Sequence, residues 1–200
     1  MSSELVAALA GFAFVASITP GPNNLMVMAS GANFGFRRTI PHLAGILIGF
    51  MVMIFLVGIG LARIFEAFPA VRLALVVVSC AYLGWLAWKI ATAAPAEEGE
   101  GVGQPFTFLQ AALFQWVNPK AWMMALTAVT LYGADGSTAA LALVALVFGA
   151  INVPCVAAWA VAGQQAGRWL SNAGRLRIFN RTMAILLLAS LAPAIAGEFG

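Results

Sequence analysis

Charged residues are scarce in this 200-residue chain. Asp, Glu, Lys and Arg together make up 8% of it, whereas hydrophobic residues make up 62%. Soluble domains carry about 25% charged residues, so this chain could not cover a soluble surface. Its mean hydropathy is +0.96. The scarcity of charge excludes a soluble domain and predicts a protein embedded in a lipid bilayer. The net charge of +3 does not indicate a nucleic-acid partner, because the positions of the basic residues follow membrane orientation.

The residues that usually carry redox, metal or hydrolytic chemistry are also few. Cys80 and Cys155 stand apart in apolar segments, away from any Cys-x-x-Cys motif, which disfavours a transmembrane thiol–disulfide carrier. His42 is the single histidine, and no His-Glu-x-x-His motif or buried His–Ser pair indicates an intramembrane hydrolase. We therefore predict a protein that is not an enzyme and holds no metal or other cofactor. A channel, or a small-ion or metal exporter of related architecture, stays open as an alternative, although no carboxylate, Cys or His cluster marks a cation path.

Long apolar segments fill most of the chain. We count six, at about 5–33, 40–62, 70–91, 106–132, 138–164 and 178–196. Each has the length and apolar character of a membrane-spanning helix. The expected fold is an all-α membrane protein with six transmembrane helices, in which residues 1–200 form a single transport domain.

A polar stretch divides the chain almost in the middle. This linker, at about 93–105, is rich in Gly, Pro and Glu and separates two halves of three spans each, about 1–92 and 106–200. Three spans per half force the second half to enter the membrane from the opposite side. The sequence therefore predicts two inverted three-helix repeats, an arrangement found in many secondary transporters.

The basic residues predict an orientation. Most lie in or beside the odd-numbered loops, namely Arg37, Arg38, Lys89, Arg168, Arg175, Arg177 and Arg181. Because basic loops stay cytoplasmic, both termini are expected outside the cytoplasm. Arg63 and Arg72, in the second loop, partly oppose this orientation.

The first span contains two prolines. The motif is Thr19-Pro20-Gly21-Pro22-Asn23-Asn24, and two prolines within three residues should break the helix there. Pro22 suits the first position of a new half-helix, whose first N–H groups, those of Asn23, Asn24 and Leu25, would point into the break. These groups carry the positive end of the helix dipole and favour an anion.

The first span of the second half contains a matching motif, Asn118-Pro119-Lys120. Asn118 is expected to cap a half-helix that begins at Pro119, with the N–H groups of Lys120, Ala121 and Trp122 free. Lys120 is the one basic residue deep inside a predicted span, and such residues usually serve a pathway or a partner. Two helix N-termini and an ammonium describe a carboxylate pocket. In the alternative interpretation Lys120 snorkels to an interface and the prolines only kink the helices.

Acceptors are expected on the other side of this pocket. The carbonyls of Ala16, Ile18 and Gln115 lose their helical partners, and the amides of Asn23 and Asn24 also accept, so together they could hold a substrate ammonium. No Asp or Glu lies deep in any span. A zwitterionic or anionic substrate is therefore favoured over a dibasic one.

Three further features bear on the transport pathway and on the packing of helices or subunits. His42 follows Pro41 at the mouth of the second span and is a candidate for proton coupling, against the simpler interpretation of an interfacial histidine. Asn152, near Pro154, is a candidate pathway residue. Three small-xxx-small pairs predict close helix packing within the chain or in a homodimer, at Gly31/Gly35, Gly45/Gly49 and Gly163/Gly167.

The two proline motifs, with Gly45, Gly49 and Tyr82-Leu83-Gly84-Trp85-Leu86, resemble the LysE/RhtB family of amino-acid exporters over nearly the whole chain. The resemblance implies a six-helix inner-membrane protein that moves amino acids out of the cell, driven by an ion gradient of protons or sodium. Many relatives carry an aspartate directly after Thr-Pro-Gly-Pro, where this chain has Asn23. A carboxylate role at that position does not transfer. We expect a secondary exporter of a small amino acid or derivative that works by alternating access.

Overall fold

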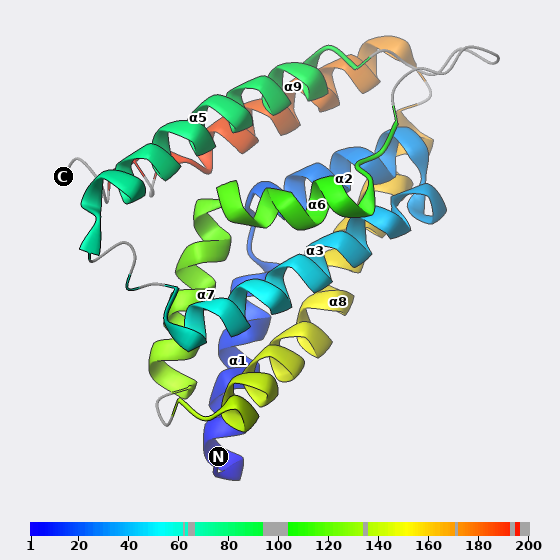
Figure 1. Cartoon of the computed structure of the whole chain (residues 1–200). Coiled ribbons are helices and arrows are strands. Elements are labelled where there is room, and N and C mark those ends of the chain that lie inside the picture. The colour runs from blue at the N-terminus through cyan, green and yellow to red at the C-terminus, as the bar shows by residue number, and fades with distance from the viewer. Residues whose placement is uncertain are drawn as a thin grey trace.

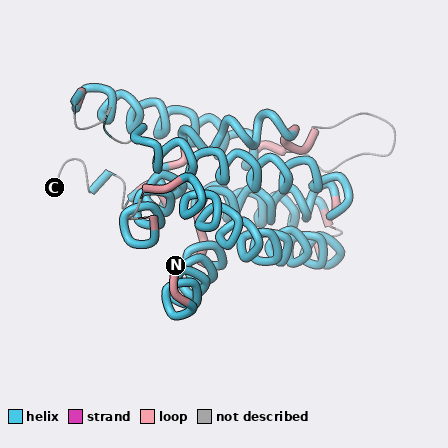
Figure 2. Tube along the Cα trace, turned by 60° about the horizontal axis from the view of Figure 1, so that its bottom comes forward, coloured by secondary structure: helices cyan, strands magenta, loops and turns pink. Residues whose placement is uncertain are grey.

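The chain is described by a computed structural model at residues 1–61, 63, 67–93, 104–133, 136–170, 172–192 and 195–196. Over these residues it is helical and contains no strand, as the trace in Figure 2 shows. The expectation of an all-α protein is confirmed. Most of the expected linker at 93–105, with its glutamates, lies outside the described residues.

The helices follow the same order in both halves: a broken pair, a long helix and one more helix. The first half contains α1 (Ser3–Ile18), α2 (Pro22–Phe34), α3 (Phe36–Leu56), the π-helical turn η1 (Val57–Leu61) and α5 (Pro69–Ala91). The second contains α6 (Phe108–Phe114), the 3₁₀ turn η2 (Gln115–Val117), α7 (Pro119–Tyr132), α8 (Thr138–Trp169) and α9 (Ala173–Ala189). Both expected breaks are present, between α1 and α2 and between η2 and α7.

Three of the described helices are long and apolar enough to cross a membrane: α3 with η1, most of α5, and α8. The α1–α2 pair, bent by 54°, makes a fourth if it is taken as one span. The segments expected to span at 106–132 and 178–196 are mostly helical at their described residues, but α6, α7 and α9 are each shorter than a full span.

Glycines bring α2 and α8 together. A Cβ added at Gly31 would meet the Ala160 carbonyl of α8, and one added at Gly163 would meet the Met28 carbonyl of α2. This close approach of two backbones is the packing that small residues permit between membrane helices. At these positions the small-residue pairs pack within the chain.

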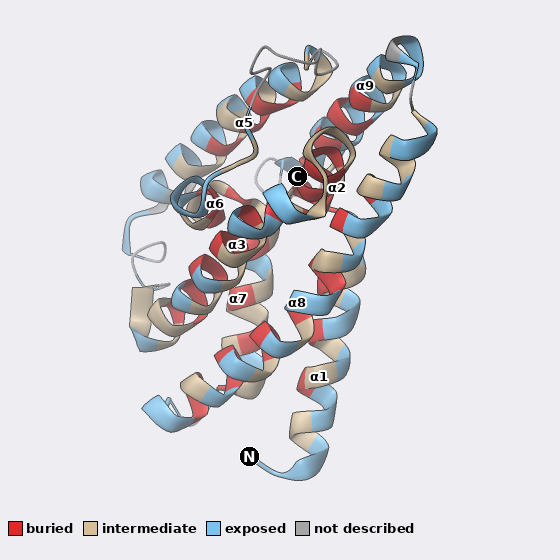
Figure 3. Cartoon of the chain, turned by 90° about the vertical axis from the view of Figure 1, so that its right-hand side faces the viewer, coloured by how far each residue is buried: buried red, intermediate tan, exposed pale blue. Residues whose placement is uncertain are grey.

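The helices form two groups in space. Figure 1 shows α5 and α9 side by side along one edge, while α1, α2, α3, α6, α7 and α8 form the rest of the molecule. The largest buried cluster joins α1, α3, α7 and α8, with Phe148 contacting Phe50 at 5.0 Å between ring centroids. In Figure 3 the buried residues face the interior of this group, and much of α5 faces outward. Several buried residues are polar, among them Ser17, Asn24, Gln115, Asn118 and Asn152, and they lie around the two breaks.

Candidate functional site

The first break spans Thr19 to Gly21. Thr19 caps α1 in an extended conformation, and Gly21 precedes α2 with φ of −178°. This φ is open to any residue, so backbone conformation does not require glycine here. A Cβ at Gly21 would lie 2.6 Å from Cδ of Lys120, whose flexible side chain would have to shift to make room. The two motifs are therefore in direct contact.

The carbonyls at the end of α1 are all bonded, and most of the donors come from other elements. Asn24 Nδ2 donates to the carbonyls of Ser17 and Thr19, each at 2.8 Å, and Trp159 Nε1 of α8 donates to that of Ile18 at 3.1 Å. Thr19 Oγ1 donates to the carbonyl of Ala16. Side chains thus provide the hydrogen-bond donors that the N–H groups of the next helical turn would have provided. The prediction that Ala16 and Ile18 offer vacant carbonyls was wrong.

Lys120 extends from α7 into the first break. Its ammonium donates to the Thr19 carbonyl at 2.8 Å, to Thr19 Oγ1 at 2.9 Å and to the Pro20 carbonyl at 3.3 Å. An ammonium has three donors, so all of them are engaged. Lys120 acts as a cap on the broken end of α1, a role that its sequence context did not indicate.

The second break is closed by its own residues. Asn118, the expected N-cap, accepts from the Lys120 N–H through Oδ1 at 3.2 Å, and its carbonyl accepts from Ala121 and Trp122. The Gln115 carbonyl accepts from the Asn118 N–H. The predictions of free N–H groups in α7 and of a free Gln115 carbonyl were therefore wrong, because one asparagine satisfies the whole turn.

The start of α2 is less completely capped. Leu25 donates to the Gly21 carbonyl at 3.0 Å, so its N–H is not free as expected. The N–H groups of Asn23 and Asn24 have no acceptor among the described residues, and Gly21 offers no side-chain cap. Two unpaired N–H groups remain at the positive end of this helix dipole.

An amide pair joins the two halves beside the breaks. Asn23 Nδ2 donates to Gln115 Oε1 at 2.8 Å, and Gln115 Nε2 donates back to Asn23 Oδ1 at 3.2 Å. Gln115 is fully buried and also donates to the Ala111 carbonyl. The prediction treated Gln115 only as a carbonyl, although a polar side chain directly before a broken segment is itself a signal.

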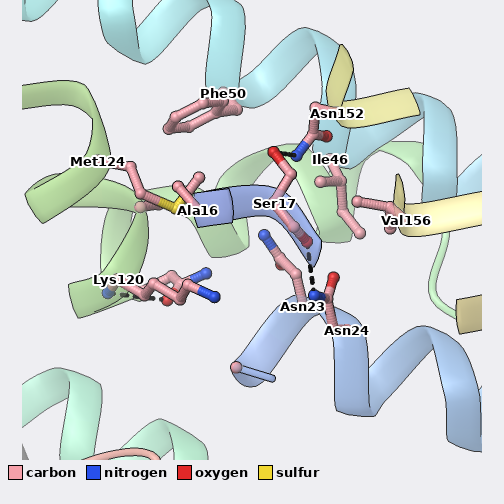
Figure 4. Close-up of a pocket in the computed structure, with 13 residues that line it drawn as sticks. Ala16, Ser17, Asn23, Asn24, Ile46, Phe50, Lys120, Met124, Asn152 and Val156 are labelled. Atoms are coloured by element: carbon pink, nitrogen blue, oxygen red, sulfur yellow. Dashed lines mark hydrogen bonds between the residues drawn. The ribbon is translucent and has the colours of Figure 1, made fainter. Parts of the chain in front are cut away.

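Between the breaks lies a small cavity, shown in Figure 4 and called the central cavity. Its volume is about 20 Å³, room for one water molecule. It is lined by Ala16, Ser17, Gly21, Asn23, Asn24, Ile46, Phe50, Asn118, Lys120, Ala121, Met124, Asn152 and Val156. Five predicted substrate-binding residues are therefore brought together on one cavity, namely Gly21, Asn23, Asn24, Asn118 and Lys120, together with the predicted pathway residue Asn152.

Asn152 also lines this cavity. Its Nδ2 donates to Ser17 Oγ at 3.0 Å. Oδ1 of Asn152 and Oδ1 of Asn24 receive no hydrogen bond from the described residues. The cavity therefore offers amide oxygens as acceptors, and its lining contains no carboxylate.

Other predicted residues lie outside the lining. Thr19 and Pro20 are exposed, and Pro22 and Pro119 serve as the first residues of α2 and α7. His42 lies on α3, buried and at another cavity. Ser17 and Trp159 were not predicted, and nothing in the spacing of an apolar span could have identified them. Among the described residues no three His, Cys, Asp or Glu side chains gather as a metal site would require.

Cysteine/O-acetylserine efflux proteins of Escherichia coli, including strain K12, and of Shigella sonnei are 31% identical to the chain over 194 residues, which cover 94% of this chain and 96% of theirs. No solved structure is significantly similar to it. The family model for the LysE type translocator matches residues 14–192, which include both breaks. The chain thus belongs to the LysE type translocator family.

Proposed function

We propose that this translocator exports a small zwitterionic amino acid by alternating access, with the central cavity as its substrate site. One observation carries the proposal. Hydrogen-bond donors for a carboxylate and acceptors for an ammonium face the same cavity, between two broken helices. The efflux proteins named above carry cysteine and O-acetylserine in their names, and both compounds are small zwitterions.

The substrate carboxylate would bind between Lys120 and the start of α2. The N–H groups of Asn23 and Asn24 are without acceptors there, and the Lys120 ammonium lies within reach of the same cavity. Lys120 now donates to the neutral carbonyls of Thr19 and Pro20. A carboxylate makes a stronger charge-assisted hydrogen bond, so it would take over part of this coordination. Binding would then release the end of α1 from α7.

The substrate ammonium would bind Oδ1 of Asn24 and of Asn152. Both oxygens lack donors, and both asparagines are more than 90% buried. Because no carboxylate lines the cavity, a second cationic group would remain uncompensated. This arrangement favours a neutral amino acid over lysine or arginine.

The site must enlarge to admit such a molecule. A cavity of about 20 Å³ holds one water molecule, which is much less than an amino acid occupies. Thr19 and Pro20 are exposed, and non-helical backbone at membrane depth persists only where protein or water covers it. We therefore place a water-filled route at the first break, which opens when that break moves.

The same proposal extends to the membrane arrangement. Six spans in two inverted repeats would bring the paired breaks to the midplane, with both termini outside the cytoplasm of a bacterial inner membrane. A proton or sodium gradient would drive export, and a homodimer is compatible with the exposed apolar faces. A small-ion or metal exporter is the alternative. Among the described residues, Lys120 is the one charged side chain of the lining, and this positive charge favours an amino acid with a carboxylate over a free cation.

The test uses purified protein in proteoliposomes and counterflow of labelled L-cysteine or O-acetyl-L-serine. Lys120→Ala should lower substrate affinity by about 10- to 100-fold, because a hydrogen bond to a charged group contributes about 1.5–3 kcal/mol. Arg168→Gln, which removes an exposed basic side chain from the end of α8, is the matched control.

Lys120 also stabilises the break, so a second measurement separates recognition from folding. 2-Aminoethyl acetate, the analogue of O-acetylserine without its carboxylate, should compete poorly with substrate in the wild type. Lys120→Ala should reduce this discrimination, because the variant lacks the ammonium that would bind the carboxylate in the central cavity. Transport by the variant at the wild-type affinity, with discrimination intact, would remove Lys120 from substrate recognition. Absence of amino-acid counterflow in the wild type would overturn the proposed function.

A further inference from the structure

A second and much larger cavity lies beside the first. This side cavity, of about 570 Å³, is formed by α2, α3, α5, the start of α6 and the residues at 104–107. Polar and aromatic groups share its lining, among them Ser30, Asn33, His42, Tyr82, Phe106 and Gln110. Its volume suffices for an amino acid without any movement of the helices.

His42 is the unexplained group in this cavity. The side chain is 1% exposed, and neither Nδ1 nor Nε2 has a hydrogen-bond partner among the described residues. Its ring packs against Phe106 with 5.2 Å between centroids. Leaving a buried polar group without a partner costs free energy, so the orphaned imidazole indicates a partner that the described residues do not supply.

Two helices, α2 and α3, each line both cavities with residues of one face. On α3, His42 lines the side cavity, and Ile46, one turn later, lines the central cavity. On α2, Asn23 lines the central cavity and Ser30, two turns later, lines the side cavity. Val27 of α2, Ile46 of α3 and Ala111 of α6 belong to one buried apolar cluster. A short apolar barrier thus separates a spacious site from a closed one.

The residues that line the side cavity favour a zwitterionic amino acid, as those of the central cavity do. Among the described residues, the lining of the side cavity contains no Asp or Glu, and Lys89, the one lysine or arginine there, has Nζ 4.6 Å from the Trp85 ring centroid. Both imidazole nitrogens are buried in this structure, so a carboxylate oxygen would accept the His42 N–H once a neighbouring side chain, such as Phe106, has shifted. The cavity also lies beside the expected linker, at the end of the molecule that the basic loops assign to the cytoplasm.

We propose that the side cavity is an entry site, in which a zwitterionic amino acid from the cytoplasm binds with its carboxylate on His42 before it passes the Val27–Ile46–Ala111 barrier to the central cavity. The proposal rests on the proposed export function. It assigns a separate substrate site to the orphaned imidazole and to a volume that the closed central cavity lacks.

The experiment exploits the single histidine. Protein without a histidine tag, labelled with ¹⁵N-histidine and placed in lipid nanodiscs, gives ring signals from His42 alone. O-acetyl-L-serine should shift these signals in a saturable manner, and 2-aminoethyl acetate, which lacks the carboxylate, should not. The same saturable shift is expected in Lys120→Ala, because the entry site does not use Lys120.

Transport supplies an independent measurement. His42→Phe should raise the half-saturating cytoplasmic substrate concentration about tenfold, through the loss of one hydrogen bond to a charged group. His42→Gln, which keeps an N–H donor, should restore most of the affinity. A purely packing role would favour Phe over Gln and reverse this order.

The outcomes separate the two proposals. If wild-type protein transports the amino acid but the His42 signals do not respond, or respond only while Lys120 is present, the entry site is wrong and the proposed function stands. If the wild type transports no amino acid, the proposed function fails, and the entry site fails with it. A carboxylate-dependent shift that survives Lys120→Ala in a transporting protein supports both.

Discussion

The two breaks share a proline at the first helical position but are closed in different ways. At the second break Asn118 alone caps α7. Its side chain accepts a hydrogen bond from the Lys120 N–H, and its carbonyl accepts from the N–H groups of the next two residues, Ala121 and Trp122. At the first break the carbonyls of α1 are held by side chains from α2, α7 and α8. One break is self-contained, and the other depends on its neighbours.

This difference indicates which break can move. A turn that satisfies its own backbone groups stays intact when neighbouring helices shift. A turn held by Asn24, Lys120 and Trp159 changes whenever α7 or α8 changes position, or whenever a ligand competes for the lysine. We infer that α1 is the mobile half-helix and that α7 is the fixed one. Lys120 of α7 contacts the broken end of α1.

The strongest test of this comparison is Asn24→Leu. The substitution keeps the size of the side chain but leaves the Ser17 carbonyl without a donor, whereas the Thr19 carbonyl keeps Lys120. A buried unsatisfied carbonyl costs about 1–3 kcal/mol, so the apparent melting temperature in detergent should fall and counterflow should be lost. Asn24→Asp, which keeps the shape but loses the donor, should behave similarly. Unchanged stability in both variants would show that the first break does not need its side-chain donors.

The helical organisation and both break positions could be predicted from the sequence, because prolines and apolar length act locally. Pro22 and Pro119 begin α2 and α7, and Asn118 caps α7, as expected. The partners of the broken ends could not be predicted. Trp159 lies 141 residues from the Ile18 carbonyl that it bonds, and no local pattern records such a contact.

The central cavity could also be predicted only in part from the sequence. Its lysine, asparagines and glycine were identified because polar groups inside apolar spans are conspicuous. Whether their donors and acceptors stay vacant depends on tertiary contacts, and here most of the predicted vacancies are filled. The side cavity was not foreseen, because the groove between α5 and the start of α6 arises only when distant helices pack.

A smaller effect is expected at the self-contained break. Asn118→Ala removes the N-cap of α7 and should lower the free energy of unfolding by about 1 kcal/mol, because helix caps contribute about that much. Asn118→Ser, which also caps helices, should recover most of this loss. Thermal unfolding of the three proteins in detergent measures the difference. A loss for Asn118→Ala as large as that for Asn24→Leu would contradict the assignment of α7 as the independently closed half-helix.

The smallest change in stability, with the clearest functional consequence, is expected for Gly21→Ala. The new methyl group would lie 2.6 Å from Cδ of Lys120, and a flexible lysine can shift without disturbing the fold. The melting temperature should therefore change little, while Lys120 is pushed from the Thr19 carbonyl and counterflow falls several-fold. Gly11→Ala is the matched control, because a Cβ there has no neighbour within 4 Å. If Gly21→Ala transports like Gly11→Ala, the contact between the two breaks is not part of the transport cycle. The movement of α1 relative to α7 must then be coupled through other residues.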